Sequence, residues 1–281
     1  MSFKKKPIRI IPFLDIKNGL LIKGINLEGL RILGNAKDFA NLYYKDGADE
    51  ICYLDNVATL YGTSNLSKFI KNTAKMVFVP LSVAGGIRTI ENSLEMFKAG
   101  ADKIIINSAA IDNIKFLKKL VTIFGSANIS ILIQSIKIKN KYMISKSNGR
   151  DIIDFSPVDW AKRVEDAGAG EIIITSVNNE GLGRGFDLNI TNKISRAVSL
   201  PVIAHGGAGS FRDIYNVIKS TKISGVGLAS MLHYDAIKYL PKVNTKIGNT
   251  DFLDRVKRFK RKKILLKEIK KYLKNKGILI R

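Results

Sequence analysis

Pro80-Leu-Ser-Val-Ala-Gly-Gly-Ile87 and Pro201-Val-Ile-Ala-His-Gly-Gly-Ala208 are two apolar segments that each end in a pair of glycines. Each apolar run predicts a buried strand, and the glycines predict a turn whose backbone amides a ligand can approach closely. The two segments lie 121 residues apart (201 − 80 = 121). The chain therefore carries the same strand-and-turn unit twice.

Two more pairs of segments repeat in the same order. Upstream, Gly47-Ala-Asp-Glu-Ile51 matches Gly168-Ala-Gly-Glu-Ile172 at an offset of 121 residues (168 − 47 = 121). Downstream, Ile106-Asn-Ser-Ala109 matches Leu228-Ala-Ser-Met231 at an offset of 122 residues (228 − 106 = 122). Three blocks at a nearly constant spacing indicate two similar halves.

Predicted strands and helices alternate through both halves, which favours a parallel α/β architecture. We predict a long loop over residues 16–36, an inserted hairpin over 137–151 and an insertion over about 237–263. The eight predicted strands are 8–14, 50–54, 81–84, 103–106, 129–134, 171–175, 202–204 and 225–229. Eight such units predict a single (β/α)8 TIM barrel over residues 1–281, built of two half-barrels, with its chemistry on the loops after the strands. A doubly wound open sheet is the structural alternative.

The composition limits the compartment and the partners. No apolar run approaches the ~20 residues that span a bilayer, and Met1-Ser-Phe-Lys-Lys-Lys6 lacks an apolar signal core, so we expect a cytoplasmic protein with no membrane partner. The net charge of +23 is typical of nucleic-acid binders, but the lysines are spread along the chain without a nucleic-acid motif. We therefore expect no nucleic-acid partner. The densest basic cluster, Arg255 to Lys263, predicts a solvated helical face or a docking surface.

Cys52 is the single cysteine, and it lies in the apolar run from Ile51 to Leu54. We predict a buried, inert thiol. Any cysteine-dependent chemistry must then come from another chain. We expect neither a metal ion nor a cofactor.

Small polar residues follow the predicted strands where a barrel binds its ligands. Glycine amides, a hydroxyl and the start of the next helix together predict a phosphate site. The repeat predicts two sites, which suit a substrate with a phosphate at each end; the alternative is that the glycines only turn the chain. The first cradle is Gly85, Gly86, Asn107 and Ser108, and the second is Gly206, Gly207, Ala229 and Ser230. His205 borders the second cradle as a ligand donor or as a packed residue, and we interpret His233 as structural.

A series of spaced motifs resembles the cyclase subunit of imidazole glycerol phosphate synthase. The resemblance covers residues 7–235 nearly without gaps and resumes over 266–281. The sister isomerase of histidine biosynthesis shares the half-barrels, but Lys23-Gly24, Glu50, Lys103 and Glu171 match the cyclase better. The matching motifs are Ile11-Pro-Phe-Leu-Asp15-Ile-Lys-Asn-Gly19, Lys23-Gly24, Asp46-Gly-Ala-Asp-Glu50, Leu54-Asp55, Ala84-Gly-Gly-Ile87, Gly100-Ala-Asp-Lys103, Ile106-Asn-Ser-Ala-Ala110, Gly168-Ala-Gly-Glu171 and Gly206-Gly-Ala-Gly209.

The resemblance implies a lyase-type reaction. Ammonia from a glutaminase partner attacks a bis-phosphorylated aminoimidazole carboxamide ribonucleotide, giving imidazole glycerol phosphate and the carboxamide ribotide. It also implies that Lys23, Glu180 and Gly181 join the cradles in binding substrate. The family uses two aspartates as general acid and base. Asp15 holds the first position, but Gln134 holds the second, and a glutamine transfers no proton near neutral pH.

The resemblance further implies an ammonia entrance at the N-terminal face of the barrel. We refer to its residues, Arg9, Glu50, Lys103 and Glu171, as the charge ring. A purely structural salt-bridge ring is the alternative, since paired charges tolerate burial. Asp102 matches a family position at the glutaminase interface.

Three functions remain open from the sequence. The first is the cyclase of histidine biosynthesis, with Asp15 assisted by a neighbour such as Ser135 or Glu180. The second is a relative that passes ammonia to a separate amidotransferase, for example one that modifies an amino sugar for surface polysaccharide. The retained charge ring together with Gln134 favours the second. The third is a non-enzymatic scaffold, whose cradles would bind nothing.

Overall fold

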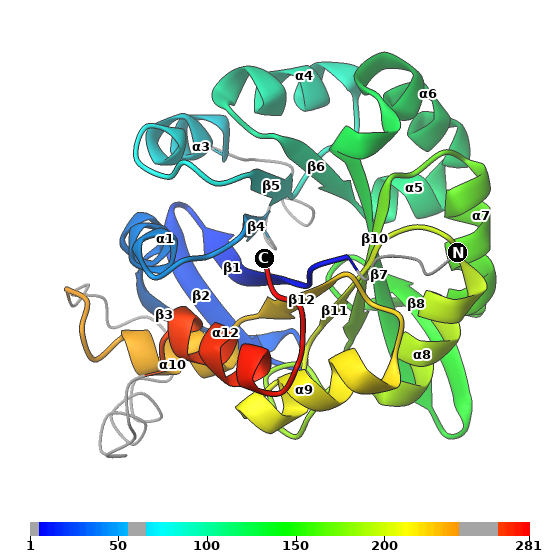
Figure 1. The fold of residues 1–281 in the computed structure, drawn as a ribbon. Coiled ribbons are helices and arrows are strands. Elements are labelled where there is room, and N and C mark those ends of the chain that lie inside the picture. Colours follow the sequence, from blue (N-terminus) through cyan, green and yellow to red (C-terminus); the bar gives the residue numbers. More distant parts are fainter. Residues whose placement is uncertain (1–5, 56–65, 242–263) are drawn as a thin grey trace.

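The strands form a closed ring, so the predicted barrel is confirmed and the open sheet is excluded (Figure 1). The computed structural model describes residues 6–55, 66–241 and 264–281. The last strand pairs in parallel with the first, which closes the barrel. The order around the barrel is β1 (Arg9–Lys17), β4 (Ile51–Asp55), β5 (Leu81–Ala84), β6 (Lys103–Ile106), β7 (Ile129–Ile138), β10 (Glu171–Ser176), β11 (Val202–His205) and β12 (Gly225–Leu228).

Helices surround the strands, as the alternation predicts (Figure 1). Several begin at a side chain that accepts a hydrogen bond from a free backbone amide of the first turn, as Thr89 and Ser156 do. The helices are α1 (Ala36–Lys45), α3 (Leu66–Ala74), α4 (Ile90–Ala99), α5 (Ser108–Asp112), α6 (Ile114–Phe124), α7 (Pro157–Asp166), α8 (Leu188–Ala197), α9 (Phe211–Ser220), α10 (Ser230–Ala236) and α12 (Leu266–Asn275). A short 3₁₀ turn, Ser126–Asn128, precedes β7.

Two apolar cores hold the barrel together. The larger one lies between the strands and the surrounding helices. The smaller one fills the barrel interior and includes Phe13, Cys52 and Leu132. Cys52 is buried as predicted, and burial, together with the charge of Glu50, raises the pKa of its thiol well above the ordinary range. The thiol is therefore protonated and unreactive at neutral pH.

The predicted loop over residues 16–36 is wrong. It forms an antiparallel hairpin of β2 (Leu20–Ile25) and β3 (Glu28–Asn35), and β2 pairs with the end of β1. Asn18 and Gly19 have φ of 51° and 76°, as a tight turn between two twisted strands requires. Asn-Gly is a known hairpin signal, and here it joins β1 to β2.

The inserted hairpin over residues 137–151 is confirmed. It consists of the end of β7 with β8 (Lys141–Lys146) and β9 (Asp151–Ile153). The predicted insertion over 237–263, with its basic cluster, falls mostly on residues 242–263, which lie outside the described residues. No helix in the described part of the chain is long and apolar enough to cross a membrane. Within those same ranges, no group of His, Cys, Asp or Glu is placed to hold a metal ion.

His233 joins α10 to the barrel, as its structural interpretation predicts. Its Nε2 lies 2.8 Å from the Phe13 carbonyl oxygen and its Nδ1 lies 2.7 Å from the Tyr43 hydroxyl. Since the carbonyl can only accept, Nε2 carries the proton and Nδ1 accepts from Tyr43. Both ring nitrogens are therefore satisfied in the neutral form.

We expect the contribution of His233 to stability to disappear in acid. Burial lowers its pKa to about 4, while an unfolded histidine titrates near 6.5, so the unfolded state takes up the proton first as the pH falls. The contribution is complete above about pH 6.5 and declines towards pH 4, by up to about 3 kcal/mol. Urea unfolding of the natural chain and of His233→Gln, which does not titrate, measures it. The stability difference between the two should narrow over this range, and a constant difference would contradict the assignment.

Candidate functional site

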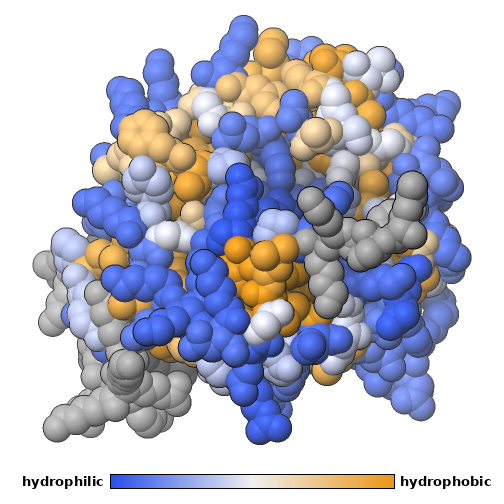
Figure 2. All heavy atoms as spheres, viewed as in Figure 1, coloured by the Kyte–Doolittle hydropathy of each residue, from blue (hydrophilic) through white to orange (hydrophobic). Residues whose placement is uncertain are grey.

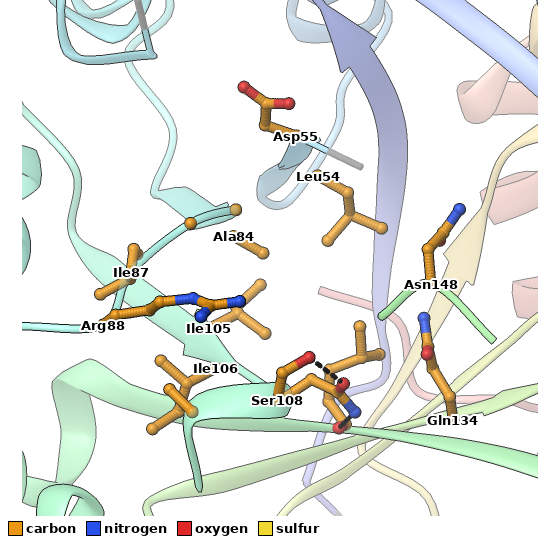
Figure 3. A pocket seen from close by; sticks show the side chains of 15 residues that line it. Leu54, Asp55, Ala84, Ile87, Arg88, Ile105, Ile106, Ser108, Gln134 and Asn148 are labelled. Carbon is orange, nitrogen blue, oxygen red and sulfur yellow. Dashed lines mark hydrogen bonds between the residues drawn. The ribbon is translucent and has the colours of Figure 1, made fainter. Parts of the chain in front are cut away.

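The first cradle lines a cavity at the C-terminal ends of β5 and β6 (Figure 3). Gly85 and Gly86 have φ of 129° and 63°, which side chains rarely adopt. A Cβ at position 85 would lie 2.5 Å from the Asp55 Cβ, so the turn has no room for a side chain. All four predicted residues of the first cradle, with Gln134, line this one cavity.

The second cradle lines a smaller cavity at the ends of β11 and β12. Gly206 and Gly207 again have positive φ, 85° and 112°. A Cβ at position 207 would lie 2.1 Å from the Gly185 carbonyl oxygen. Glu180, Gly181 and His205 also line this cavity.

The two cradles lie on opposite sides of the barrel, because β5–β6 and β11–β12 are separated by two strands in either direction. The residues that precede α5 and α10 have nearly the same backbone conformation. Asn107 has φ and ψ of −128° and −84°, and Ala229 has −131° and −93°. The sequence repeat is therefore a repeat of local geometry, and it places two equivalent turns across the mouth of the barrel.

A buried cluster of charges lies at the same end, on β1, β2 and the loop after β10. The Lys23 ammonium donates to Asp15 Oδ2 at 2.7 Å and also to Glu180 Oε1. Lys23 reaches both carboxylates because the Asn18-Gly19 turn folds β2 back along β1. Burial disfavours the charge of Lys23, but the two carboxylates outweigh burial, so its pKa is raised. Lys23 therefore remains charged and keeps Asp15 close to an ammonium.

Gln134 lies apart from that cluster. It is buried on β7, and its Oε1 accepts a hydrogen bond from the Gly149 amide at 3.1 Å. Asp15 and Gln134 thus occupy opposite strands of the mouth, as the repeat predicts, but only Asp15 can transfer a proton. In this chain the Gln134 side chain holds the turn between β8 and β9.

That turn meets the turn between β2 and β3. The Asn148 side chain donates to the Leu27 carbonyl at 3.2 Å, and the Leu27 amide donates to Glu180 Oε2 at 3.2 Å. Leu27 has a φ of 67°, which is uncommon for a leucine, and it is buried. The two hairpins are therefore bonded to each other and to the charge cluster.

The charge ring forms at the opposite end of the barrel, as the sequence predicts. Arg9 donates to Glu50 at 2.9 Å and also to Glu171, and Lys103 lies 3.3 Å from Glu50 and 3.2 Å from Glu171. Each cation bridges the same two carboxylates. The four charges form a closed, electrically neutral ring at the barrel floor.

Two serines complete the charge ring, and the sequence did not predict them. Ser82 donates to Glu50, and Ser130 donates to Glu171 at 3.1 Å. Both serines are buried at or near the starts of their strands. Each carboxylate of the ring therefore accepts a neutral hydrogen bond in addition to its ion pairs. A lone serine in an apolar strand carries no distinctive sequence signal, so only the strand register reveals their role.

Arg88, Asp55 and Asn148 also line the cavity of the first cradle, and the sequence did not predict them as site residues. Figure 3 shows the guanidinium of Arg88 extending towards the cavity. Its place two residues after the Gly-Gly turn is the signal that could have found it. Asp102, the predicted interface residue, is exposed, and its Oδ2 accepts from the Leu81 amide at 2.8 Å.

Comparison with known proteins agrees with this geometry. A family model described as "Histidine biosynthesis protein" matches residues 9–238. "Imidazole glycerol phosphate synthase subunit HisF" of Legionella pneumophila is 44% identical over 207 residues, which are 73% of this chain and 98% of the relative. The proteins of that name from Clostridium botulinum (strain Okra / Type B1) and Bacillus cereus (strain Q1) are 35% and 41% identical. Their alignments cover 97% and 80% of this chain and 98% and 90% of the relatives.

These matches extend over both half-barrels, and the chain covers nearly the whole length of each relative. The family matched is also the one that the spaced motifs resemble. The chain belongs to the histidine biosynthesis protein family and, within it, to the HisF-like cyclase subunits of imidazole glycerol phosphate synthase.

Proposed function

We propose that the chain is the synthase subunit of a glutamine amidotransferase complex in which a partner glutaminase supplies ammonia. One observation carries the proposal: a closed charge ring lies at one end of the barrel, and two glycine cradles lie at the other. Ammonia enters at the ring, and a substrate with two phosphate groups binds across the cradles. The apolar interior between them excludes water.

The reaction is the one that the family resemblance implies. Ammonia attacks the bis-phosphorylated aminoimidazole carboxamide ribonucleotide, which yields imidazole glycerol phosphate and the carboxamide ribotide. Asp15 is the general acid-base group, and Lys23 holds its carboxylate in place at 2.7 Å. Gly181, Gly206 and the other cradle residues bind the phosphates. Because Gln134 supplies no proton transfer, we infer that this turnover is slow.

Gln134 also favours a second candidate function. A chain that keeps its charge ring but lacks one proton-transfer group can still deliver ammonia. The acceptor would then belong to a separate amidotransferase, for example one that acts on an amino sugar for surface polysaccharide. Turnover of the bis-phosphorylated ribonucleotide distinguishes the two functions, since the second predicts that it stays negligible.

The N-terminal face of the barrel is the proposed surface for the glutaminase. Three hydrophobic side chains near this face are strongly exposed: Phe78 at 74%, Ile123 at 55% and Leu279 at 55%. Phe78 and Ile123 precede β5 and β7, and the Leu279 carbonyl accepts from the Ile8 amide just before β1. Figures 1 and 2 view the molecule from the side on which the C-terminus lies. Figure 2 shows hydrophobic atoms gathered near the middle of this face. Asp102 and the charge ring lie at the same strand starts. Aromatic residues such as phenylalanine are enriched in protein–protein interfaces, and exposed apolar patches mark interaction sites.

We expect a stoichiometric complex when the chain is co-expressed with the glutaminase encoded near it. Phe78→Ser should weaken that complex at least about tenfold, because buried aromatic anchors dominate interface energies. Ile152→Ser is the matched control: Ile152 is 42% exposed but lies on β9, away from this face. Titration calorimetry measures both variants. Failure to form a complex, or equal weakening by the two substitutions, would remove the docking proposal.

A further inference from the structure

His205 is the last residue of β11, where the second cradle begins. Only one of its two ring nitrogens is hydrogen-bonded within the described residues. The ring is buried and stacks on Phe13, with the ring centroids 4.4 Å apart. Its Nδ1 lies 2.9 Å from the Thr175 hydroxyl oxygen. Its Nε2 is buried and has no hydrogen-bond partner among the described residues. A buried polar atom left without a partner destabilises the protein unless a ligand or water satisfies it.

Thr175 determines which ring nitrogen carries the proton. The Thr175 hydroxyl is buried, and the described part of the chain offers it only His205 Nδ1 as a hydrogen-bond partner. If Nδ1 were the donor, the hydroxyl proton would have no acceptor. If Nδ1 accepts, that proton is satisfied and Nε2 carries the ring proton. The second arrangement leaves one unsatisfied donor, the Nε2–H, at the cradle.

The ring is also neutral. Burial and the nearby charge of Lys23 lower the pKa of His205 to about 3. It therefore offers one N–H and no positive charge at neutral pH. Ser230 lines the same cavity, and its buried Oγ likewise has no hydrogen-bond partner within the described ranges. Two unused side-chain groups thus accompany the Gly206 and Gly207 turn.

The first cradle differs in this respect. The Asn107 side chain donates to the carbonyls of Leu132 and Ser145, and the Ser108 hydroxyl accepts from the Ser147 amide at 3.1 Å. Those side chains are already satisfied within the chain. The two cradles therefore share a backbone conformation but differ in their free side-chain groups.

We propose that His205 is a ligand-binding residue of the second cradle and that its Nε2–H donates to an oxygen of a phosphate monoester bound there, beside the Ser230 hydroxyl. The inference rests on the proposed function, which places a phosphate group at the second cradle. It adds His205 as a side chain that recognises this phosphate group. A phosphate oxygen is an acceptor without a proton, so it matches an N–H group. The glycine at position 227 leaves room for the His205 ring, because a Cβ at that position would lie 3.0 Å from His205 Cδ2 and 2.7 Å from Phe13 Cε2.

Nitrogen-detected NMR of the histidine rings tests the proposal on the natural chain. The sequence has two histidines, so His233, whose two nitrogens are both bonded inside the protein, is an internal control. The probe is glycerol 3-phosphate. We expect His205 in the Nε2–H form before addition, and we expect its Nε2–H signal to shift and become protected from exchange on saturation. The His233 signals should stay unchanged.

The backbone amides of Gly206 and Gly207 separate the two possible failures. If these amides shift while the His205 ring signals do not, or if His205 carries its proton on Nδ1, the His205 proposal is overturned and the proposed function stands. If the amide signals of neither cradle shift, both the His205 proposal and the proposed function are overturned. Inorganic phosphate should produce the same His205 shift, since the contact is to the phosphate group alone.

A double substitution measures the size of the effect. His205→Phe with Thr175→Val keeps a ring stacked on Phe13 and removes the hydrogen-bonding pair together, so no buried hydroxyl is left without a partner. Glycerol 3-phosphate should bind the second cradle about ten- to a hundredfold more weakly, the range for a hydrogen bond to a charged group. The amide of Gly86, at the first cradle, should titrate as in the natural chain. Unchanged affinity at the second cradle would overturn the proposal.

Discussion

Gln134→Asp is expected to raise ammonia-dependent turnover of the bis-phosphorylated ribonucleotide by about 10²–10⁴-fold. One positioned acid-base group contributes about that much, which corresponds to about 3–5 kcal/mol of the barrier. Asp15 and position 134 lie on opposite strands at the mouth, so an aspartate there would complete a pair of carboxylates across the substrate. The measurement is single-substrate kinetics with excess ammonia and no glutaminase.

Matched variants separate proton transfer from a change of shape. Gln134→Asn introduces a side chain of the same size as aspartate but without a carboxylate. Both variants shorten the side chain and so remove the hydrogen bond that Gln134 accepts from the Gly149 amide. Gln134→Asn should stay as slow as the natural chain. Gln134→Asp combined with Asp15→Asn should lose the gain. Fast turnover by the natural chain that also survives Asp15→Asn would show that the chemistry lies on other residues.

Arg9→Ala is expected to lower the free energy of unfolding by about 3–5 kcal/mol. Arg9 donates to Glu50 and Glu171, whose side chains are only 4% and 6% exposed. Removal of the arginine leaves two buried carboxylates that share Lys103 as their cation, and uncompensated buried charge is costly. Urea unfolding measures the change. The same variant should disturb glutamine-dependent turnover more than turnover with free ammonia.

An exposed ion pair is the control for Arg9. Lys141 pairs with Asp154 on the hairpin, and both side chains are more than 60% exposed, at 64% and 67%. Lys141→Ala should therefore change stability by no more than about 1 kcal/mol. Arg9→Ala with Glu171→Gln should recover part of the loss, because it removes one charge of each sign. Equal effects of Arg9→Ala and Lys141→Ala would mean that the charge ring adds little to stability.

The barrel could be predicted because its strands are short apolar runs with clear ends. The strands 81–84 and 103–106 have the predicted bounds, since glycine or asparagine follows each one directly. The β2 and β3 strands were missed because their residues lack a regular apolar alternation, and the main signal is the Asn18-Gly19 turn that joins β1 to β2. Tight turns depend on φ at two residues, which composition does not reveal.

The candidate site could be predicted residue by residue but not as contacts. Asp15 and Lys23 each lie in a matching motif, and the resemblance implied Glu180 as a binding residue. Their meeting in one buried cluster depends on β2 folding back along β1. Ser82 and Ser130 were missed because a lone serine in an apolar strand has no distinctive pattern. Their roles follow from register, which places each hydroxyl beside a carboxylate.

The charge ring does not share the twofold repeat of the chain. Glu50 and Glu171 are repeat-related (171 − 50 = 121), but Arg9 corresponds to Asn128 at the offset of 119 that relates Asp15 to Gln134 (134 − 15 = 119; 9 + 119 = 128). Lys103 corresponds to Gly225 at the downstream offset of 122 (103 + 122 = 225). Both cations therefore come from the first half. A barrel assembled from two identical first halves would keep paired cradles but carry two surplus positive charges at its floor, and one from two second halves would carry two unbalanced carboxylates. The symmetry that suits a two-phosphate ligand is broken at the other end, where only the complete chain is neutral.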